Sequence, residues 1–163
     1  MTRIACRLRP YSSCLVPEKR RELTTEGGLD VARSFRAVGE CVKRLQGRGV
    51  IVSIFIDPDK GQIVKAAETG AEFIELHTGR FADTKGAEAK RELKRLADAA
   101  KFAKSIGLHV NAGHGINYEN IRGILEIPFL EELNIGHSII CRSVFSGIAG
   151  AVKEMPDELE GYR

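Results

Sequence analysis

The stretch Val50-Ile51-Val52-Ser53-Ile54-Phe55-Ile56 decides the fold class of this 163-residue chain. Its residues are apolar almost throughout, whereas a half-exposed strand would alternate, and this is typical of a parallel strand covered on both faces. Asp57-Pro58-Asp59 follows directly and predicts the start of a helix that runs to about Thr69, where Gly70 ends it. The stretch therefore predicts one strand–helix unit of a parallel α/β fold.

The same alternation continues on both sides of this unit. We expect further strands at 11–16, 73–78, 108–111 and 132–135, and further helices at 31–47, 86–106, 118–126 and 137–152. Strands that alternate with helices of about 10–20 residues predict βαβ units with right-handed crossovers. Five units are visible. Both an open doubly wound sheet and part of a closed barrel satisfy that count.

Polar residues at the strand ends favour the barrel. Glu18, Asp57, Glu75 with His77, His114 and His137 each follow or end an expected strand. A barrel assembles its site from several strand ends, whereas an open sheet gathers its ligand at one switch point. No G-x-G-x-x-G follows the first strand, so a dinucleotide site has little support.

Composition and charge exclude several classes of protein. Hydrophobic residues make up 43% and charged residues 29%, as in an ordinary soluble globular domain. The net charge is only +3, and Lys and Arg are interleaved with Glu and Asp, which favours a solvated surface over a nucleic-acid track. No stretch approaches the ~18 apolar residues of a membrane span. We therefore expect neither nucleic acid nor membrane as a partner.

The cysteines and the N-terminus indicate a reducing compartment. None of the four cysteines forms a C-x-x-C pair, so we expect reduced, buried thiols in a cytosolic protein. The first 17 residues contain three Arg and no acidic residue, as transit peptides do, but a truncated start upstream of a strand is the favoured interpretation. The four histidines show no H-x-x-x-H spacing, and no metal site is predicted.

Two strand ends carry candidate catalytic residues. His114 lies between Gly113 and Gly115, which leaves its imidazole exposed in a loop and suited to proton donation near neutral pH. Glu75 interrupts an apolar strand, and its burial calls for a cation, a protonated histidine or a substrate group. His77 lies two residues on and projects to the same side, so a structural Glu–His pair is the alternative.

Two further segments are candidates for substrate binding. Gly136-His137 lies where the last strand turns into a helix, and free N–H groups at a helix start bind phosphate. The alternative is a tight turn with a capping histidine. The segment that begins at Thr24-Thr25 and continues with Glu, Gly and Gly has the composition of a hydrogen-bonding lid loop.

Six segments together resemble the pyridoxine 5′-phosphate synthase family, in its order and spacing. They are residues 14–19 (CLVPEK), 24–30 (TTEGGLD), 55–57 (FID), 73–79 (FIELHTG), 110–115 (VNAGHG) and 132–137 (ELNIGH). The resemblance implies a (β/α)₈ or TIM barrel, of which residues 11–155 supply about five of the eight units. It leaves an unmatched segment at 1–10 and a loose tail at 156–163.

The resemblance also implies an activity. The family enzyme is a cytoplasmic transferase of vitamin B6 biosynthesis that condenses 3-amino-2-oxopropyl phosphate with 1-deoxy-D-xylulose 5-phosphate. The products are pyridoxine 5′-phosphate, phosphate and water. The resemblance implies no metal or organic cofactor, phosphorylated small molecules as substrates, and a homo-octamer in the complete enzyme.

By the same resemblance, particular residues take particular roles. His114 matches the family's proton donor, and Glu75 matches a carboxylate that stabilises the transition state. Thr24 matches a contact to the deoxyxylulose phosphate. The contacts to the aminooxopropyl phosphate match Gly115, Gly136 and His137.

One departure from the family is large. The family begins with three further strand–helix units that carry its proton-accepting histidine and glutamate, and residues 1–9 match none of them. We therefore expect a truncated chain that holds half of an active site and has an open sheet edge. The alternative is a non-catalytic, phosphate-binding fragment of such a barrel. Another phosphate-binding barrel, such as a sugar-phosphate isomerase or epimerase, lacks support from the ordered motifs.

Overall fold

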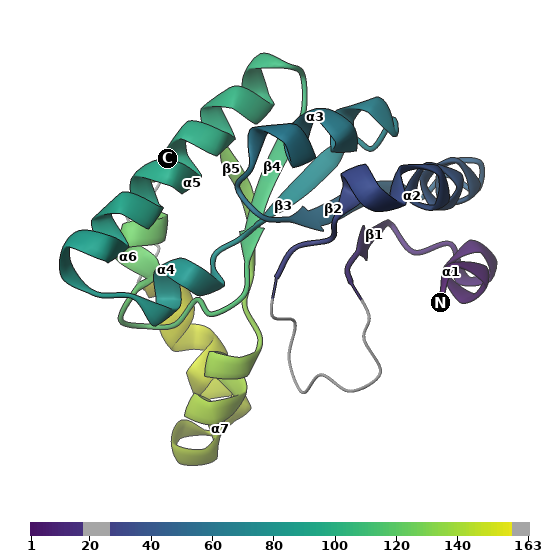
Figure 1. The fold of residues 1–163 in the computed structure, drawn as a ribbon. Helices are drawn as coiled ribbons and strands as arrows, with labels where there is room; N and C mark the ends of the chain where they lie inside the picture. Colours follow the sequence, from purple (N-terminus) through teal and green to yellow (C-terminus); the bar gives the residue numbers. More distant parts are fainter. Residues whose placement is uncertain (18–26, 158–163) are drawn as a thin grey trace.

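Five parallel strands alternate with helices in the computed structural model, which describes residues 1–17 and 27–157 (Figure 1). The elements are α1 (Thr2–Leu8), β1 (Ser12–Leu15), α2 (Val31–Gln46), β2 (Ile51–Ile56), α3 (Lys60–Glu68), β3 (Phe73–His77), α4 (Gly79–Asp83), α5 (Gly86–Ser105), β4 (His109–Gly113), α6 (Ile121–Ile124), β5 (Leu130–Asn134) and α7 (His137–Asp157). The predicted α/β class is confirmed.

The order of the strands decides between the two architectures left open by the sequence. It is β1-β2-β3-β4-β5, and every neighbouring pair is parallel. A doubly wound sheet reverses its order at a switch point, whereas a (β/α)₈ barrel adds each strand beside the one before it. The sequential order therefore agrees with a partial barrel.

Aspartates begin the first two large helices at the places that the sequence predicts. The Asp30 carboxylate accepts a hydrogen bond from the backbone N–H of Arg33 (3.1 Å) and caps α2. Asp59 caps α3 in the same way through the N–H of Gln62 (3.0 Å). Gly70, with φ +86°, ends that helix in a left-handed conformation that favours glycine.

The two faces of the sheet differ in chemistry. One face carries fully buried aliphatic side chains, including Val52, Ile54 and Ile74, and helices α2, α3 and α5 cover it (Figure 1). Because side chains alternate along a strand, the intervening residues point to the opposite face. That face carries Glu75 and Asn111, both buried. In a barrel this second face would be the interior.

Several element boundaries differ from those expected. Residues 79–83 form the short helix α4 where a loop was expected, and α6 has four residues instead of nine. Gly123 lies within α6, and the ring of Phe81 from α4 occupies the space where a Gly123 Cβ would be. α7 continues to Asp157, but Gly147 with φ +71° interrupts its helical geometry. In the described residues, no helix is long and apolar enough to cross a membrane.

The expectation of buried thiols is wrong. All four cysteines are free, but Cys14 and Cys141 are exposed and Cys6 and Cys41 only partly buried. Cys14 stands on β1, an edge of the sheet, so no neighbouring strand covers its outer side among the described residues. The apolar composition around it therefore does not produce full burial.

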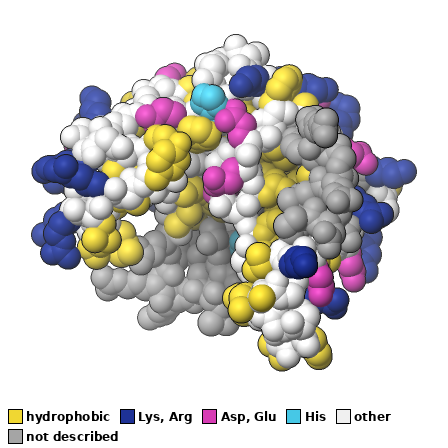
Figure 2. Space-filling view, turned by 180° about the vertical axis from the view of Figure 1, so that it is seen from behind, with side chains coloured by type: hydrophobic (Ala, Val, Ile, Leu, Met, Phe, Trp, Pro, Cys, Tyr) yellow, Lys and Arg dark blue, Asp and Glu magenta, His cyan; other side chains and the backbone are white. Residues whose placement is uncertain are grey.

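The last helix exposes an apolar face. Ile140, Val144, Ile148 and Val152 follow one another at intervals of four residues, and Phe145 lies beside them at 88% exposure. In the view from behind, hydrophobic side chains are open on the projecting segment where Figure 1 places α7 (Figure 2). A helix of a globular protein normally buries such a face. In the described part of the chain these side chains stay between 49% and 88% exposed.

Candidate active site at the strand ends

The parallel register sets the candidate site across the middle of the sheet face that lies opposite α2, α3 and α5. Glu75 on β3 is level with Phe55 on β2 and with Asn111 on β4, and Asn111 is level with Glu132 on β5. Glu75, Asn111 and Glu132 therefore form one polar row over three strands, and Phe55 ends it on β2. The row lies in a sheet whose other face is wholly apolar at these strands.

Glu75 is the buried carboxylate of this row. Its side chain lies on the inner face with the residue only 8% exposed, and Oε2 accepts hydrogen bonds from Asn134 Nδ2 (2.9 Å) and from the Cys14 thiol (3.4 Å). Burial raises the pKa of the carboxyl, although these two hydrogen bonds oppose the rise. The sequence predicted a cation, a protonated histidine or a substrate group as its partner. Among the described residues its hydrogen-bond partners are two neutral donors, and a substrate group stays a prediction.

Cys14 and Asn134 are functional neighbours that the sequence analysis missed. Cys14 is exposed as a whole residue on an edge strand, but its thiol points inward to Glu75. Burial of the thiol and then the charge of Glu75 raise the pKa of Cys14 to about 12. The thiol therefore stays protonated and acts as a donor. Only the pairing of β1 and β5 with the central strands brings these residues near Glu75, so sequence spacing held no signal for them.

His77 pairs with Asp57 and not with Glu75. Its Nδ1 atom lies 2.9 Å from Oδ1 of Asp57, the residue that follows β2. This hydrogen bond is the main reason that the pKa of Asp57 is lowered, and the backbone N–H of Gly28 supports it at 3.2 Å. Nε2 of His77 is buried and has no hydrogen-bond partner among the described residues. This nitrogen faces Gly79, where an added Cβ would lie 2.5 Å from it, so within that part of the chain it is a buried polar atom without a partner.

His114 adopts a strained backbone conformation beside His77. Its φ of +77° lies in the left-handed region that non-glycine residues seldom occupy. Thr78 holds this turn, because its hydroxyl donates to the carbonyl oxygens of Gly113 and His114. The rings of His114 and His77 have centroids 5.1 Å apart. Burial and then the charge of His77 lower the pKa of His114, so its imidazole is neutral at pH 7.

The predicted phosphate residues lie in two neighbouring loops. Gly115 has φ +76°, and a Cβ there would approach Cβ of Ala82 at 2.7 Å, so both backbone and space require glycine. The loop after it is tied to the start of α7 by the Ser138 hydroxyl, which donates to the carbonyl of Ile116 (2.8 Å). The structure thus brings Gly115 toward the helix start at His137.

Gly136 and His137 are more open than the rest of the site. Both are exposed, and nothing lies within 4 Å of a Cβ built on Gly136. Nε2 of His137 lies 3.5 Å from the Cys141 thiol, one turn along α7. The Gly136 carbonyl accepts from the N–H of Ile140 and begins the helix (3.0 Å). Their role in phosphate binding stays a prediction.

Two predicted positions lie outside the described residues, namely Thr24 and Glu18. For the described part of the chain, no three His, Cys, Asp or Glu side chains form a group that could hold a metal ion. What the described residues do assemble is a pair of neighbouring histidines, one of which is paired with the Asp57 carboxylate, and a second, buried carboxylate, Glu75, on an adjacent strand position. Such a cluster suits general acid–base chemistry.

The comparisons with known proteins identify the family. Residues 1–161 match the family described as "Pyridoxal phosphate biosynthesis protein PdxJ". Among solved structures, a mutant of the Thermobaculum terrenum O-GlcNAc hydrolase is similar at 12% identity and a TM-score of 0.49. The similar region covers 80% of this chain but only 36% of the hydrolase chain. Because this match spans nearly its whole length, the chain belongs to the PdxJ family of pyridoxal phosphate biosynthesis proteins.

Proposed function

We propose that this chain supplies the His114 and Glu75 side of a pyridoxine 5′-phosphate synthase site. Membership of the PdxJ family supports a synthase of vitamin B6 biosynthesis that acts on phosphorylated small molecules. The proposed substrates are 3-amino-2-oxopropyl phosphate and 1-deoxy-D-xylulose 5-phosphate. The observation that carries the proposal is the strained His114, fixed by Thr78 and adjacent to His77, at the end of the strand that pairs with the strand of Glu75.

His114 is the proposed proton donor to a departing oxygen. Its lowered pKa leaves the imidazole neutral at rest, so it first takes up a proton released earlier in the condensation. Once formed, its imidazolium is a stronger acid than that of an ordinary histidine, because burial and the His77 charge disfavour the charged form. The ring of His77 lies beside it, with centroids 5.1 Å apart, and its charge is one of the two causes that lower the pKa of His114.

Glu75 is the proposed carboxylate that stabilises developing positive charge. It has no cationic partner within 4.0 Å among the described residues, and its two hydrogen-bond donors are neutral. A buried carboxylate without a counter-charge interacts strongly with a cationic group of a substrate, since little solvent screens the pair. An iminium or ammonium formed during the condensation would be such a group.

Phosphate binding is proposed for Gly115, Gly136 and His137, with Thr24 toward the second substrate. Gly115 permits close approach of the backbone, and His137 begins the 21-residue helix α7. The link between Ser138 and Ile116 supports a shared binding surface for these two loops. Cytoplasmic localisation and assembly into a homo-octamer are proposed with the function.

A specific observation favours the alternative of a non-catalytic phosphate-binding fragment. Strands β1 and β5 are both edges of the described sheet, and α7 exposes apolar side chains on both sides of its interruption at Gly147. We therefore expect no measurable synthase activity from the 163-residue chain by itself. Formation of pyridoxine 5′-phosphate by the purified chain from both substrates would refute this expectation and support full catalysis.

The test of the site uses a complete barrel that carries this sequence. The variant His114→Asn should lower kcat by about 10²–10⁴-fold with little change in KM, the range expected for general acid catalysis. His137→Asn serves as the contrast, because loss of a phosphate contact raises KM more than it lowers kcat. If His114→Asn turns over normally, the proton-donor role is wrong.

A further inference from the structure

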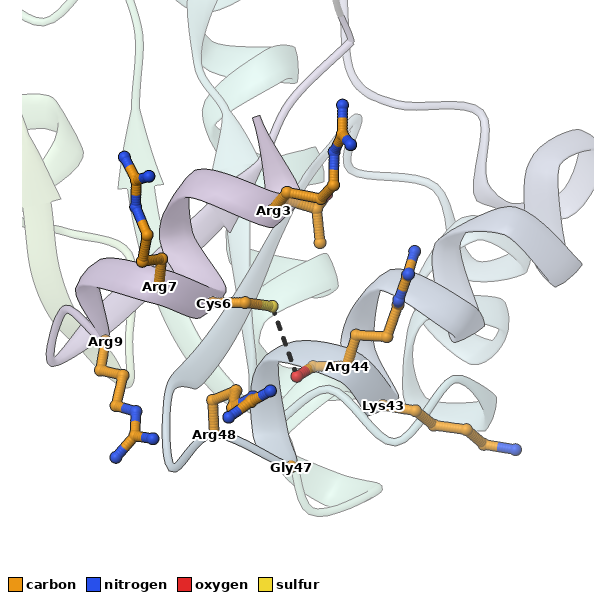
Figure 3. Close-up of a pocket in the computed structure, with 9 residues that line it drawn as sticks. Arg3, Cys6, Arg7, Arg9, Lys43, Arg44, Gly47 and Arg48 are labelled. Atoms are coloured by element: carbon orange, nitrogen blue, oxygen red, sulfur yellow. Dashed lines mark hydrogen bonds between the residues drawn. The ribbon is translucent and has the colours of Figure 1, made fainter.

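A pocket of about 700 Å³ at the other end of the molecule is strongly basic (Figure 3). It lies between α1 and the last turn of α2, and six of its lining residues are cationic: Arg3, Arg7, Arg9, Lys43, Arg44 and Arg48. Its other lining residues are a threonine, a cysteine and a glycine, so no lining residue is acidic. Since the whole chain carries a formal charge of +3, everything outside these six cations sums to −3.

The pocket is separate from the proposed active site. Helix α2 ends at Gln46, and a short turn joins it to the start of β2 at Ile51. The last turn of α2 therefore lies at the amino ends of the parallel strands. His77 and His114 lie at or after the carboxyl ends of theirs. Because the strands are parallel, these two ends are opposite edges of one sheet. A ligand of this pocket is therefore not the substrate of that site.

The cations of the pocket lack partners that cations elsewhere possess. Arg80 pairs with two glutamates and Arg142 lies 2.6 Å from Glu154. None of the six pocket cations forms an ion pair with a carboxylate of the described residues. Like charges brought together without counter-charges repel one another, and a bound anion removes that repulsion.

Helix-end electrostatics account for only part of the cluster. Lys43 and Arg44 lie in the last turn of α2, and Arg7 lies in the last turn of α1, where positive charge offsets the helix dipole. Arg3 lies in the first turn of α1, where positive charge is unfavourable, and Arg48 lies beyond the end of α2. The dipole therefore does not explain why these cations share one pocket.

The walls of the pocket are held together by side-chain contacts. The Cys6 thiol of α1 donates to the carbonyl oxygen of Arg44 (3.5 Å), and the Thr2 hydroxyl donates to the Cys41 sulfur (3.6 Å). Figure 3 shows Cys6 facing Arg44 across the gap; Arg3, Arg7 and Arg44 extend to one side of it, and Arg9 and Lys43 extend away on the other. Residues of both helices line the same pocket, so cations from α1 and from the end of α2 surround it.

We propose that this pocket binds a compact oligophosphate, recognised through its phosphate chain. Five of the six cations are Arg, whose planar fork of donors matches phosphate oxygens in pairs. The volume of about 700 Å³ suits a small molecule. No aromatic side chain lines the pocket, so it lacks the stacking platform that single-stranded nucleic acids and nucleobases require. Inorganic tripolyphosphate should therefore bind as tightly as ATP.

The test is isothermal titration of the purified 163-residue chain with tripolyphosphate and, separately, with ATP. We expect one site per chain for each, with an affinity that falls steeply between roughly 50 and 200 mM salt. The double variant Arg44→Ala, Arg48→Ala should weaken both by roughly tenfold per guanidinium removed. Both side chains are exposed, and circular dichroism checks that the variant folds.

A matched control removes the same charge from another basic patch. The double variant Arg91→Ala, Lys94→Ala acts on α5, where a smaller pocket of about 330 Å³ includes Asp98, the ion-pair partner of Lys94. It should change either affinity by less than about twofold, the effect of distant surface charge under screening. Equal losses in the two double variants, or no binding of either ligand, would overturn the proposal. So would an oligonucleotide that binds far more tightly than tripolyphosphate.

Discussion

Replacing Gly113 by alanine tests whether the Glu75 carboxylate occupies the place that the structure gives it. A Cβ on residue 113 would overlap Oε1 of Glu75 and lie 3.0 Å from its Cδ and 3.1 Å from Cβ of Asn134. Gly113 is not among the glycines with positive φ, so alanine meets no backbone penalty there. The cost of the substitution therefore reports the crowding around Glu75.

The magnitude follows from two opposing terms. Overpacking costs about 1–3 kcal/mol, and it is relieved only if the carboxylate moves away from its hydrogen bond with Asn134. Against this, alanine stabilises a compatible glycine site by about 0.4–1 kcal/mol through the unfolded state. We expect a net loss of about 1–2 kcal/mol in the free energy of unfolding, or about 2–8 °C in Tm for a chain of this size.

Urea unfolding of four chains measures the effect: the parent, Gly113→Ala, Glu75→Ala and the double variant. If the main clash is with the carboxylate, Gly113→Ala should cost much less in the Glu75→Ala background, where only the 3.1 Å contact with Cβ of Asn134 is left, which gives a coupling of about 1 kcal/mol or more. Gly39→Ala is the matched control, since nothing lies within 4 Å of its Cβ inside α2 and it should stabilise the chain by up to about 1 kcal/mol. An equal cost of Gly113→Ala in both backgrounds would refute the reasoning.

Three further predictions concern titration and association. The pKa of Glu75 is raised in the folded chain, so the free energy of unfolding should fall as pH rises from about 4.3 through the folded pKa. Urea unfolding measured at several pH values tests this, because the Glu75→Gln variant should no longer show the fall. The pKa of Asp57 is lowered in the folded chain, so its hydrogen bond with His77 stabilises the fold above about pH 3.9 and this stabilisation is lost on acidification. Asp57→Asn should reduce Tm at pH 7 and should make Tm depend less on pH in the acidic range. Val144→Lys with Phe145→Lys should reduce self-association in size-exclusion chromatography if the α7 face drives it; an unchanged elution volume would implicate the strand edges instead.

The fold could be predicted well because its signals are local. An apolar run bounded by Asp57 predicts a buried parallel strand, and Asp57-Pro58-Asp59 predicts a helix start that the structure confirms. The misplaced element α4 has a physical reason. Residues 79–83 lack a helical apolar period of their own, and their helix depends on Phe81, which packs against Gly123 of a distant segment.

The candidate site was predicted in its members but not in its pairings. Glu75, His77 and His114 are chemically capable residues at strand ends, which the sequence displays directly. The pairings depend on which strands are neighbours and on their register. They join His77 to Asp57 and Glu75 to Asn134. Sequence spacing along one strand carries no information about its neighbours.

By itself, the sequence determined the alternation of strands and helices and the ordered motifs of the PdxJ family, because both are written in consecutive residues. Only the tertiary structure decided what surrounds Glu75 and where charge gathers. Arg3 and Arg48 are far apart in a chain whose Lys and Arg are interleaved with acidic residues, so the sequence suggested an evenly solvated surface. The packing of α1 beside the end of α2 brings them into one pocket, because electrostatic interaction depends on distance in space and not on separation along the chain.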